Sequence, residues 1–205
     1  MQIKNLYAGS FASNCYIVSD NGHAAVIDPS APVGDILHYL NSNGLTLDHI
    51  ILTHGHFDHM LTLHDLKRKT GASVCIHRDD AENISDGRKN AYSLFFGGNM
   101  VFPECDKALT HGDCIPLGEV MLRVIHTPGH TKGCICIEAD DSLFTGDTLF
   151  ADSYGRCDLY GGSFVTLRSS LKYLREYSKN KNLTIYPGHG GTAKLRSALD
   201  VVEYL

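Results

Sequence analysis

The segment at positions 53–59, Thr-His-Gly-His-Phe-Asp-His, restricts the possible folds of this chain more than any other part of the sequence. It places four potential metal ligands within six residues, directly after an aliphatic run that is typical of a buried strand. In extended backbone, the side chains of His54 and His56 point to the same side. Asp58 and His59 follow where the chain turns into a predicted helix, so they can face a neighbouring point. The segment therefore predicts two adjacent metal positions at the end of a strand.

Three other turns, at 127–131, 145–148 and 187–190, share these features. Each follows a predicted strand and carries a histidine or an aspartate beside a glycine, which lets the backbone approach a metal closely. With the first segment they give seven candidate ligands: His54, His56, Asp58, His59, His130, Asp147 and His189. A catalytic zinc normally takes three protein ligands and keeps one position open. Seven ligands exceed the need of one ion, and two ions that share Asp147 would use all of them.

Apolar periodicity predicts short strands that alternate with helices in both halves of the chain. We expect strands at 2–8, 14–19, 24–28, 49–52, 73–76, 114–117, 120–125, 134–138, 142–145 and 183–186, and helices at 34–41, 59–69, 78–84, 164–177 and 193–204. The pattern weakens over 85–107, which we expect to be a long loop at the lip of a pocket. Strand-rich blocks interleaved with helices predict an α/β sandwich, in which two mixed sheets pack face to face with helices outside. The length of 205 residues is that of one domain, expected to span 1–205.

The composition excludes several classes of protein. With 43% hydrophobic and 20% charged residues the chain is expected to be globular, and its apolar runs are far shorter than the roughly 20 residues of a membrane-spanning helix. The first residues lack the features of a signal peptide, which favours a cytoplasmic protein. A net charge of −5 without runs of like charge argues against nucleic-acid and membrane partners. We therefore expect a small-molecule substrate, and the sequence does not indicate an oligomeric state.

The seven candidate ligands together resemble the metal-binding pattern of the metallo-β-lactamase superfamily, over essentially the whole chain. The resemblance implies the αβ/βα sandwich of that superfamily. It also implies two ions, the first bound by His54, His56 and His130, the second by Asp58, His59 and His189, with Asp147 as the bridge. An aspartate at 147 and a histidine at 59 resemble the glyoxalase II branch rather than the lactamases that place a cysteine in the second site.

Three further stretches, at 13–18, 146–151 and 155–159, resemble the short hydroxyacylglutathione hydrolase-like enzymes of this branch. In full-length glyoxalase II a C-terminal helical region contacts glutathione, and this chain stops one predicted helix after His189. The resemblance thus implies a hydrolase that cleaves a small thioester such as an S-acylglutathione. Zinc is the expected metal, with iron or manganese as alternatives.

The resemblance also implies roles for individual residues. A metal-bound hydroxide would attack the thioester, with Asp58 orienting it. Arg156 is expected to face the substrate, or else to form an ion pair with Asp158. We further expect Phe95 and Phe96 to close the pocket. Asp28 is expected to contact a metal-binding side chain from outside, or else to cap the turn after its strand. His126 is expected to contact the metal-binding side chains from outside, or else to be a strand-end residue.

Three other reactions of the same fold remain open. The first is that of a persulfide dioxygenase, in which a single iron binds two histidines and a carboxylate. The others are hydrolysis of a lactone or ester and RNA processing by a nuclease. The negative net charge disfavours the nuclease.

Overall fold

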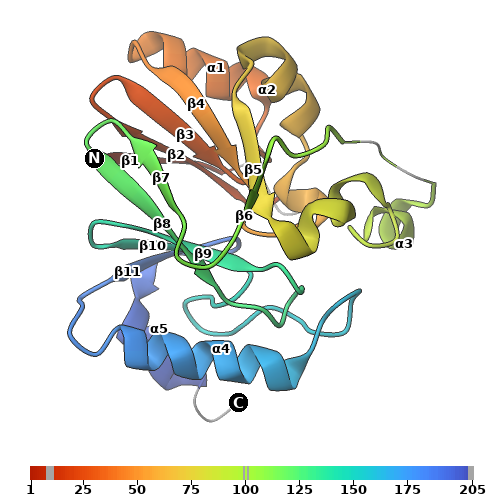
Figure 1. Ribbon diagram of the computed structural model, residues 1–205, viewed down its shortest axis with the longest axis vertical. Coiled ribbons are helices and arrows are strands. Elements are labelled where there is room, and N and C mark those ends of the chain that lie inside the picture. Colours follow the sequence, from red (N-terminus) through yellow and green to blue (C-terminus); the bar gives the residue numbers. More distant parts are fainter. Residues whose placement is uncertain (8–11, 99, 101, 203–205) are drawn as a thin grey trace.

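The computed structural model describes residues 1–7, 12–98, 100 and 102–202. Two six-stranded sheets pack face to face, and helices cover their outer faces (Figure 1). The first sheet has the order β1 (Gln2–Tyr7), β2 (Asn14–Asp20), β3 (His23–Ile27), β4 (Thr46–Ile51), β5 (Ser73–His77) and β6 (Lys107–Leu109). The second has the order β12 (Ala193–Lys194), β11 (Thr184–Pro187), β10 (Ser142–Gly146), β9 (Ile135–Ala139), β8 (Val120–His126) and β7 (Cys114–Leu117). The predicted α/β sandwich is confirmed.

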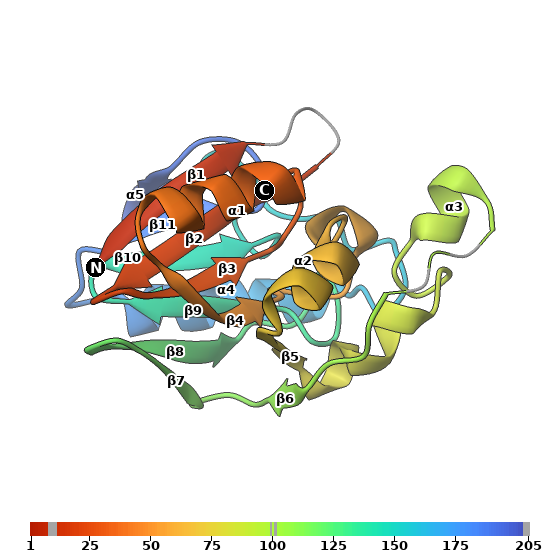
Figure 2. The same ribbon diagram turned by 90° about the horizontal axis from the view of Figure 1, so that it is seen from above.

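The helices lie in two outer layers. The first sheet is covered by α1 (Val33–Ser42) and α2 (Leu63–Thr70), and the second by α4 (Phe164–Tyr177) and α5 (Leu195–Val202) (Figure 1). Two 3₁₀ helices, η1 (Phe57–His59) and η2 (Arg78–Ser85), follow strands of the first sheet. A short helix, α3 (Tyr92–Phe96), projects sideways from the body of the molecule (Figure 2).

The two sheets and the two helical layers are separated by three layers of apolar side chains. Successive residues of a strand face opposite sides of the sheet, so β2 contributes to two layers at once. Ile17 packs under α1 and α2, whereas Tyr16 and Val18 pack between the sheets. The third layer joins the second sheet to α4 and α5. Strands buried on both faces explain why continuous aliphatic runs, rather than alternating ones, marked them in the sequence.

Strand direction brings several loops to one edge of each sheet. In the first sheet, β3, β4, β5 and β6 are parallel. In the second, β8 and β10 are both antiparallel to β9, and β11 is parallel to β10, so β8, β10 and β11 all run the same way. The loops that follow these strands carry the predicted ligands, so the topology gathers the ligands of each sheet at one edge.

Several element boundaries differ from the predicted ones. The helix predicted at 59–69 is two pieces, η1 and α2, because the start of α2 is bound to another loop: the Thr62 hydroxyl donates to the carbonyl oxygens of Pro29 and Ala31, 3.0 Å away in each case. The expected loop at 85–107 contains α3 and the start of β6. The terminal helix begins at Leu195 because the two residues before it form the edge strand β12.

Some predicted positions lie outside the described residues. These are residue 8 of the first strand, residues 99 and 101 of the long loop, and residues 203–204 of the last helix. In the part of the chain that is described, no helix has both the length and the apolar character needed to cross a membrane.

Candidate metal centre

The seven predicted ligands come from four segments that follow strands. His54 and His56 follow β4, and Asp58 and His59 lie in η1. The remaining three, His130, Asp147 and His189, follow β8, β10 and β11 respectively. The structure brings all seven together in overlapping groups whose ligand atoms lie within 4.8 Å of one another: His54, His56 and His130; His54, His59 and Asp147; and Asp58, His59 and His189.

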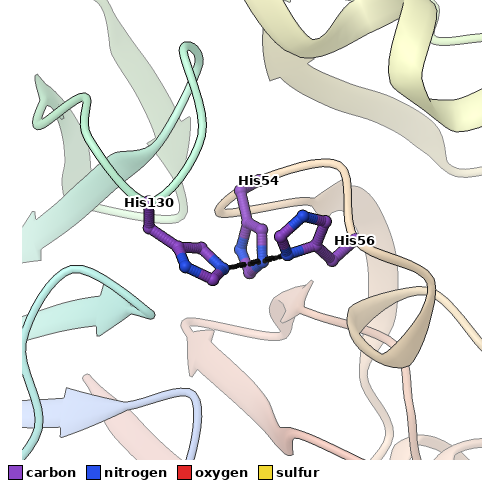
Figure 3. Close-up of side chains that lie close together, drawn as sticks. All are labelled: His54, His56 and His130. Atoms are coloured by element: carbon purple, nitrogen blue, oxygen red, sulfur yellow. Dashed lines mark hydrogen bonds between the residues drawn. The ribbon is translucent and has the colours of Figure 1, made fainter. Parts of the chain in front are cut away.

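The first group is a triangle of imidazole nitrogens (Figure 3). Nε2 of His54 lies 3.1 Å from Nδ1 of His56 and 3.2 Å from Nε2 of His130. Nδ1 of His56 lies 2.9 Å from Nε2 of His130. Two nitrogens bound to the same tetrahedral zinc ion would be roughly 3.4 Å apart, given bonds of about 2.1 Å. The three rings therefore already have nearly the spacing of a metal-binding triad.

Beside this triangle lies a second group, formed by Asp58, His59 and His189, and Asp147 lies between the two groups. Asp147 Oδ2 lies 3.5 Å from His130 Nε2 of the first group and 3.7 Å from His189 Nε2 of the second. Asp147 Oδ1 lies 3.2 Å from His59 Nε2. Asp58 Oδ2 lies 3.3 Å from His189 Nε2 and 3.8 Å from His59 Nε2. One carboxylate thus stands between two clusters of donors, which is the place of a bridging ligand.

Two buried atoms test whether a metal fits this arrangement. Four buried side-chain atoms of the described residues have no hydrogen-bond partner: His49 Nδ1, His56 Nε2, His59 Nε2 and Asp147 Oδ1. The last two lie 3.2 Å apart, at the middle of the cluster. Buried polar atoms are rarely left unsatisfied, because each costs about 1–3 kcal/mol. A divalent cation between them would satisfy both atoms, so the residues present fit divalent metals.

Two of the ligand rings are oriented by hydrogen bonds from their outer nitrogens. Nδ1 of His130 donates to the carbonyl oxygen of Arg156 at 2.6 Å. Nδ1 of His59 donates to Asp28 Oδ2 at 2.8 Å. Each bond leaves Nε2 of its ring directed at the centre.

Asp28 lies where the sequence placed it, outside the ligands and in contact with one of them. Its carboxylate accepts hydrogen bonds from the backbone N–H and the hydroxyl of Thr53, both at 2.8 Å, as well as from His59. It adopts φ of 54°, a left-handed conformation that costs a non-glycine residue energy. The three bonds hold Asp28 in this conformation and tie the end of β3 to the ligand loop.

Burial and neighbouring charges set the protonation of the cluster. Burial, followed by His130, lowers the pKa of His56 to about 3, and burial and the other histidines lower the pKa of His54 well below its usual value. Burial also acts to lower the pKa of His59, but the carboxylates of Asp147, Asp28 and Asp58 together raise it well above the usual value. The first two rings are therefore neutral near pH 7, with lone pairs available for a metal.

Sequence reasoning missed Asp80, a fully buried aspartate in η2. Its Oδ2 accepts from the backbone N–H of Gly55 at 2.9 Å and from the hydroxyl of Thr131 at 2.6 Å, and its Oδ1 accepts from the N–H of Gly133 at 2.8 Å. One carboxylate thus joins the loop of His54 to the loop of His130. The sequence signal that could have found Asp80 is its position three residues after the end of β5. A position shortly after a strand also marked the candidate ligands.

Glycine is required beside Asp147. A Cβ atom at Gly188 would lie 2.3 Å from Asp147 Oδ1 and 2.6 Å from Cε1 of His59. The backbone before His189 therefore passes too close to the other ligands for any side chain, as the glycine-flanked turns predicted.

A cavity of about 310 Å³ opens beside the cluster, and its lining includes His56, Asp58, His130, Asp147 and His189. Phe95 and Arg156, two of the predicted substrate residues, also line it. The guanidinium of Arg156, however, donates from Nε and Nη2 to both oxygens of Asp158, at 2.7 Å each. The alternative of an ion pair with Asp158 is therefore the arrangement observed.

Two predicted residues lie elsewhere. Phe96 contacts Phe57, with 5.5 Å between ring centroids, but is not in the described lining of the cavity. His126 ends β8, so the strand-end alternative is the arrangement observed. Its ring stacks on His77 at 3.9 Å, and Nε2 donates to the carbonyl oxygen of Lys132 at 2.8 Å. The bond to the Lys132 carbonyl turns this ring toward its own hairpin loop.

Comparison with known proteins identifies the family. The model of the metallo-beta-lactamase superfamily matches residues 8–189. A probable metallo-hydrolase of Methanocaldococcus jannaschii is 32% identical and covers 92% of each chain. The chain also resembles the crystal structure of the BLEG-1 B3 metallo-beta-lactamase, with a TM-score of 0.90, 27% identity and 99% coverage of both chains.

Three further relatives bear on chemistry. TTHA1623 was solved in a di-iron-bound form and matches with a TM-score of 0.84 and 28% identity, over 98% of this chain and all of the other. ETHE1 from Myxococcus xanthus matches with a TM-score of 0.78 and 25% identity, over 96% of this chain and 80% of the other. A hydroxyacylglutathione hydrolase of a Bradyrhizobium species is 32% identical over 87% of this chain and 62% of its own length. The fold, the ligand cluster and the match over residues 8–189 show that this chain belongs to the metallo-β-lactamase superfamily, whose members are generally enzymes.

Proposed function

We propose that this protein is a binuclear metal-dependent hydrolase of the glyoxalase II type and that it cleaves a small thioester. The observation that carries the proposal is the position of Asp147 between two complete sets of donors at the mouth of a cavity. A single iron takes two histidines and one carboxylate, so it would not need Asp58, His59 and His189 as ligands, yet the chain keeps all three in the same cluster. The similarity to a hydroxyacylglutathione hydrolase supports the choice of a thioester.

The lining of the cavity supports water as the nucleophile. None of its described residues is a serine, threonine, cysteine or lysine, so no side chain there could form an acyl-enzyme intermediate in the usual way. When bound, two divalent ions, zinc in this proposal, would supply Lewis acidity toward the carbonyl group and make water a stronger nucleophile at neutral pH.

The side chains then have separate tasks. Asp58 lines the cavity and is partly exposed, so its carboxylate can accept a hydrogen bond from the attacking water and orient it. Asp28 and the Arg156 carbonyl fix the orientation of His59 and His130, which keeps the donors in place during turnover. A thiolate is a good leaving group, so no strong general acid is needed at the sulfur.

Two other reactions have specific support. The similarity to ETHE1 favours a persulfide dioxygenase, which needs one iron and consumes oxygen. The similarity to BLEG-1 favours hydrolysis of a β-lactam. Both remain candidates because each would use part of the same cluster.

One experiment separates the three reactions. The protein is purified without added metal and then reconstituted with zinc or iron, and metal content is measured beside three assays: thiol release from a thioester, oxygen consumption with a persulfide, and opening of a chromogenic β-lactam. We expect close to two metals per chain and thiol release as the main activity. Saturation at one iron, with oxygen uptake and no thiol release, would establish the dioxygenase instead, and lactam opening alone would establish the lactamase.

An Asp147→Ala variant serves as the control in the same experiment. Removal of the bridging carboxylate should weaken both metal sites and lower thioester hydrolysis by orders of magnitude, with the fold retained as judged by circular dichroism. If the variant keeps two tightly bound metals and near-normal turnover, Asp147 is not the bridge.

A further inference from the structure

Part of the lining of the cavity is apolar. It is formed by Phe57, Ala91, Phe95, Phe150 and Leu159. These side chains come from η1, from α3 and the turn before it, and from the loops that follow β10. The lining of the same cavity therefore combines metal donors with hydrocarbon groups.

Phe57 lies between the metal donors and the other apolar residues of the lining. It stands between His56 and Asp58 in the chain, is 5% exposed, and contacts three rings of α3. Its ring centroid lies 5.7 Å from Tyr92, 5.8 Å from Phe95 and 5.5 Å from Phe96. A group whose carbonyl reaches the donors can therefore also contact this aromatic cluster through Phe57 and Phe95.

Phe95 is held at the rim of the cavity with 48% of its surface exposed. A large apolar side chain gains free energy when a ligand covers it, by roughly 25 cal/mol for each Å² removed from water. Its neighbour Leu94 is more exposed, at 68%, but does not line this cavity. The two residues thus share a helix and an apolar character and differ in access to the site.

The cavity offers little to a negative charge outside the metal centre. Among the described lining residues, Arg156 is the one lysine or arginine, and both oxygens of Asp158 already accept from its guanidinium. A substrate carboxylate would have to compete with this bidentate pair. The volume, about 310 Å³, is at the small end of ligand pockets, so it cannot enclose both an acyl group and a large thiol carrier.

We infer that the cavity selects an uncharged, apolar acyl group and that Phe95 is a specificity-determining residue for it. The inference rests on the proposed thioesterase function and specifies its substrate class. The acyl chain packs against Phe57, Phe95 and Leu159, while the thiol carrier leaves through the open side. In the reaction, the oxygen of water bonds to the carbonyl carbon, the carbon–sulfur bond breaks, and a proton of the water passes to the sulfur.

The test compares acyl groups on one neutral thiol, N-acetylcysteamine. Acetyl, butanoyl, hexanoyl and succinyl thioesters are assayed with the wild type, Phe95→Ala and the matched control Leu94→Ala. Each added methylene should raise kcat/KM until the cavity is filled, with a gain on the order of tenfold for the two methylenes between acetyl and butanoyl. The succinyl ester, which has the chain length of butanoyl but carries a carboxylate, should be at least tenfold poorer than butanoyl.

Phe95→Ala should remove most of the gain with chain length, and Leu94→Ala should keep it. The inference is overturned if the succinyl ester is preferred to butanoyl, or if Phe95→Ala leaves the ratio of the butanoyl and acetyl rates unchanged.

A binding measurement separates this inference from the proposed function. Ketones in which a methylene replaces the thioester sulfur cannot be hydrolysed, and their affinity is measured by calorimetry with the same three proteins. If the wild type cleaves no thioester but binds the hexanoyl ketone more tightly than the acetyl ketone in a Phe95-dependent manner, the proposed function fails and the apolar site stands. If thioesters are cleaved but ketone affinity is independent of chain length, the function stands and the inference fails.

Discussion

At the scale of single residues, the site depends on side chains that do not themselves face the centre. Asp28 and Asp80 are both buried carboxylates at strand ends, and each accepts three hydrogen bonds. Asp28 orients a ring, whereas Asp80 joins two loops through their backbones. Burial raises the pKa of Asp80, and its three donors oppose that rise. The role of each carboxylate is therefore to accept hydrogen bonds from the groups that it holds in place.

We predict that Asp80→Asn weakens metal binding, although Asp80 is not a ligand. An amide has one acceptor oxygen where the carboxylate has two, so one of the N–H groups of Gly55 and Gly133 loses its partner. Loops that carry His54 and His130 should then separate slightly, and metal affinity should fall on the order of tenfold. Competition with a chromogenic chelator measures the affinity.

Asp106→Asn is the matched control for this variant. Asp106 also accepts from a backbone N–H, that of Val74 at 2.8 Å, but lies at the start of β6, away from the ligands. Its substitution should leave metal affinity unchanged. Equal losses of affinity in the two variants would mean that general destabilisation, and not the link between the two loops, causes the effect.

At the scale of elements, α4 supports the loop that carries His130. The backbone N–H of Ser163, the N-cap of α4, donates to the carbonyl oxygen of Gly129 at 2.7 Å. Gly129 has φ of 142°, and a Cβ there would lie 2.3 Å from the backbone of Leu167. The helix and the ligand loop therefore touch backbone to backbone.

Gly129→Ala should push α4 and the His130 loop apart. We expect a loss of about 1–3 kcal/mol in the free energy of unfolding, as for other overpacked sites, together with weaker metal binding. Gly34→Ala, in α1, is the control because a Cβ at that position meets no atom within 4 Å. Urea unfolding and chelator competition measure the two effects. A Gly129→Ala variant with unaltered metal affinity would show that the loop tolerates movement of the helix.

At the scale of the whole molecule, the candidate ligands come from both sheets. His54, His56, Asp58 and His59 follow β4 of the first sheet, whereas His130, Asp147 and His189 follow strands of the second. A bound ion would therefore link the two halves of the sandwich. Because a ligand that binds only the folded state stabilises it, metal binding and folding should be coupled.

Removal of metal should lower the melting temperature of the whole protein. At a free metal concentration about 100 times Kd, binding adds about 2.7 kcal/mol to stability. For a chain of this length, that corresponds to roughly 5–10 °C. Differential scanning calorimetry before and after chelation measures the shift, and added zinc should reverse it. If elemental analysis shows that the metal is gone and the melting temperature has not moved, the ions do not link the sheets.

Local patterns in the sequence were sufficient to predict the sandwich, its main strands and the seven candidate ligands. Each of these depends on neighbours along the chain: an aliphatic run, a glycine turn, and histidine or aspartate at the end of a strand. Asp28 was also found in this way, because it follows a strand directly. The boundaries at 59–69 and 85–107 were missed, since contacts to distant loops, such as those of Thr62, override local propensity there.

Only the tertiary structure decided how these local features meet. The parallel run of β8, β10 and β11 brings His130, Asp147 and His189 to one edge, and sheet packing sets that edge against the loop after β4. Three further features were visible only in the tertiary structure: the role of Asp80, the ion pair of Arg156 and the stacking of His126 on His77. The physical reason is that a side chain's hydrogen-bond partner or packing neighbour is chosen by distance in space, and the residues on opposite sides of this site are separated by up to 135 positions, from His54 to His189.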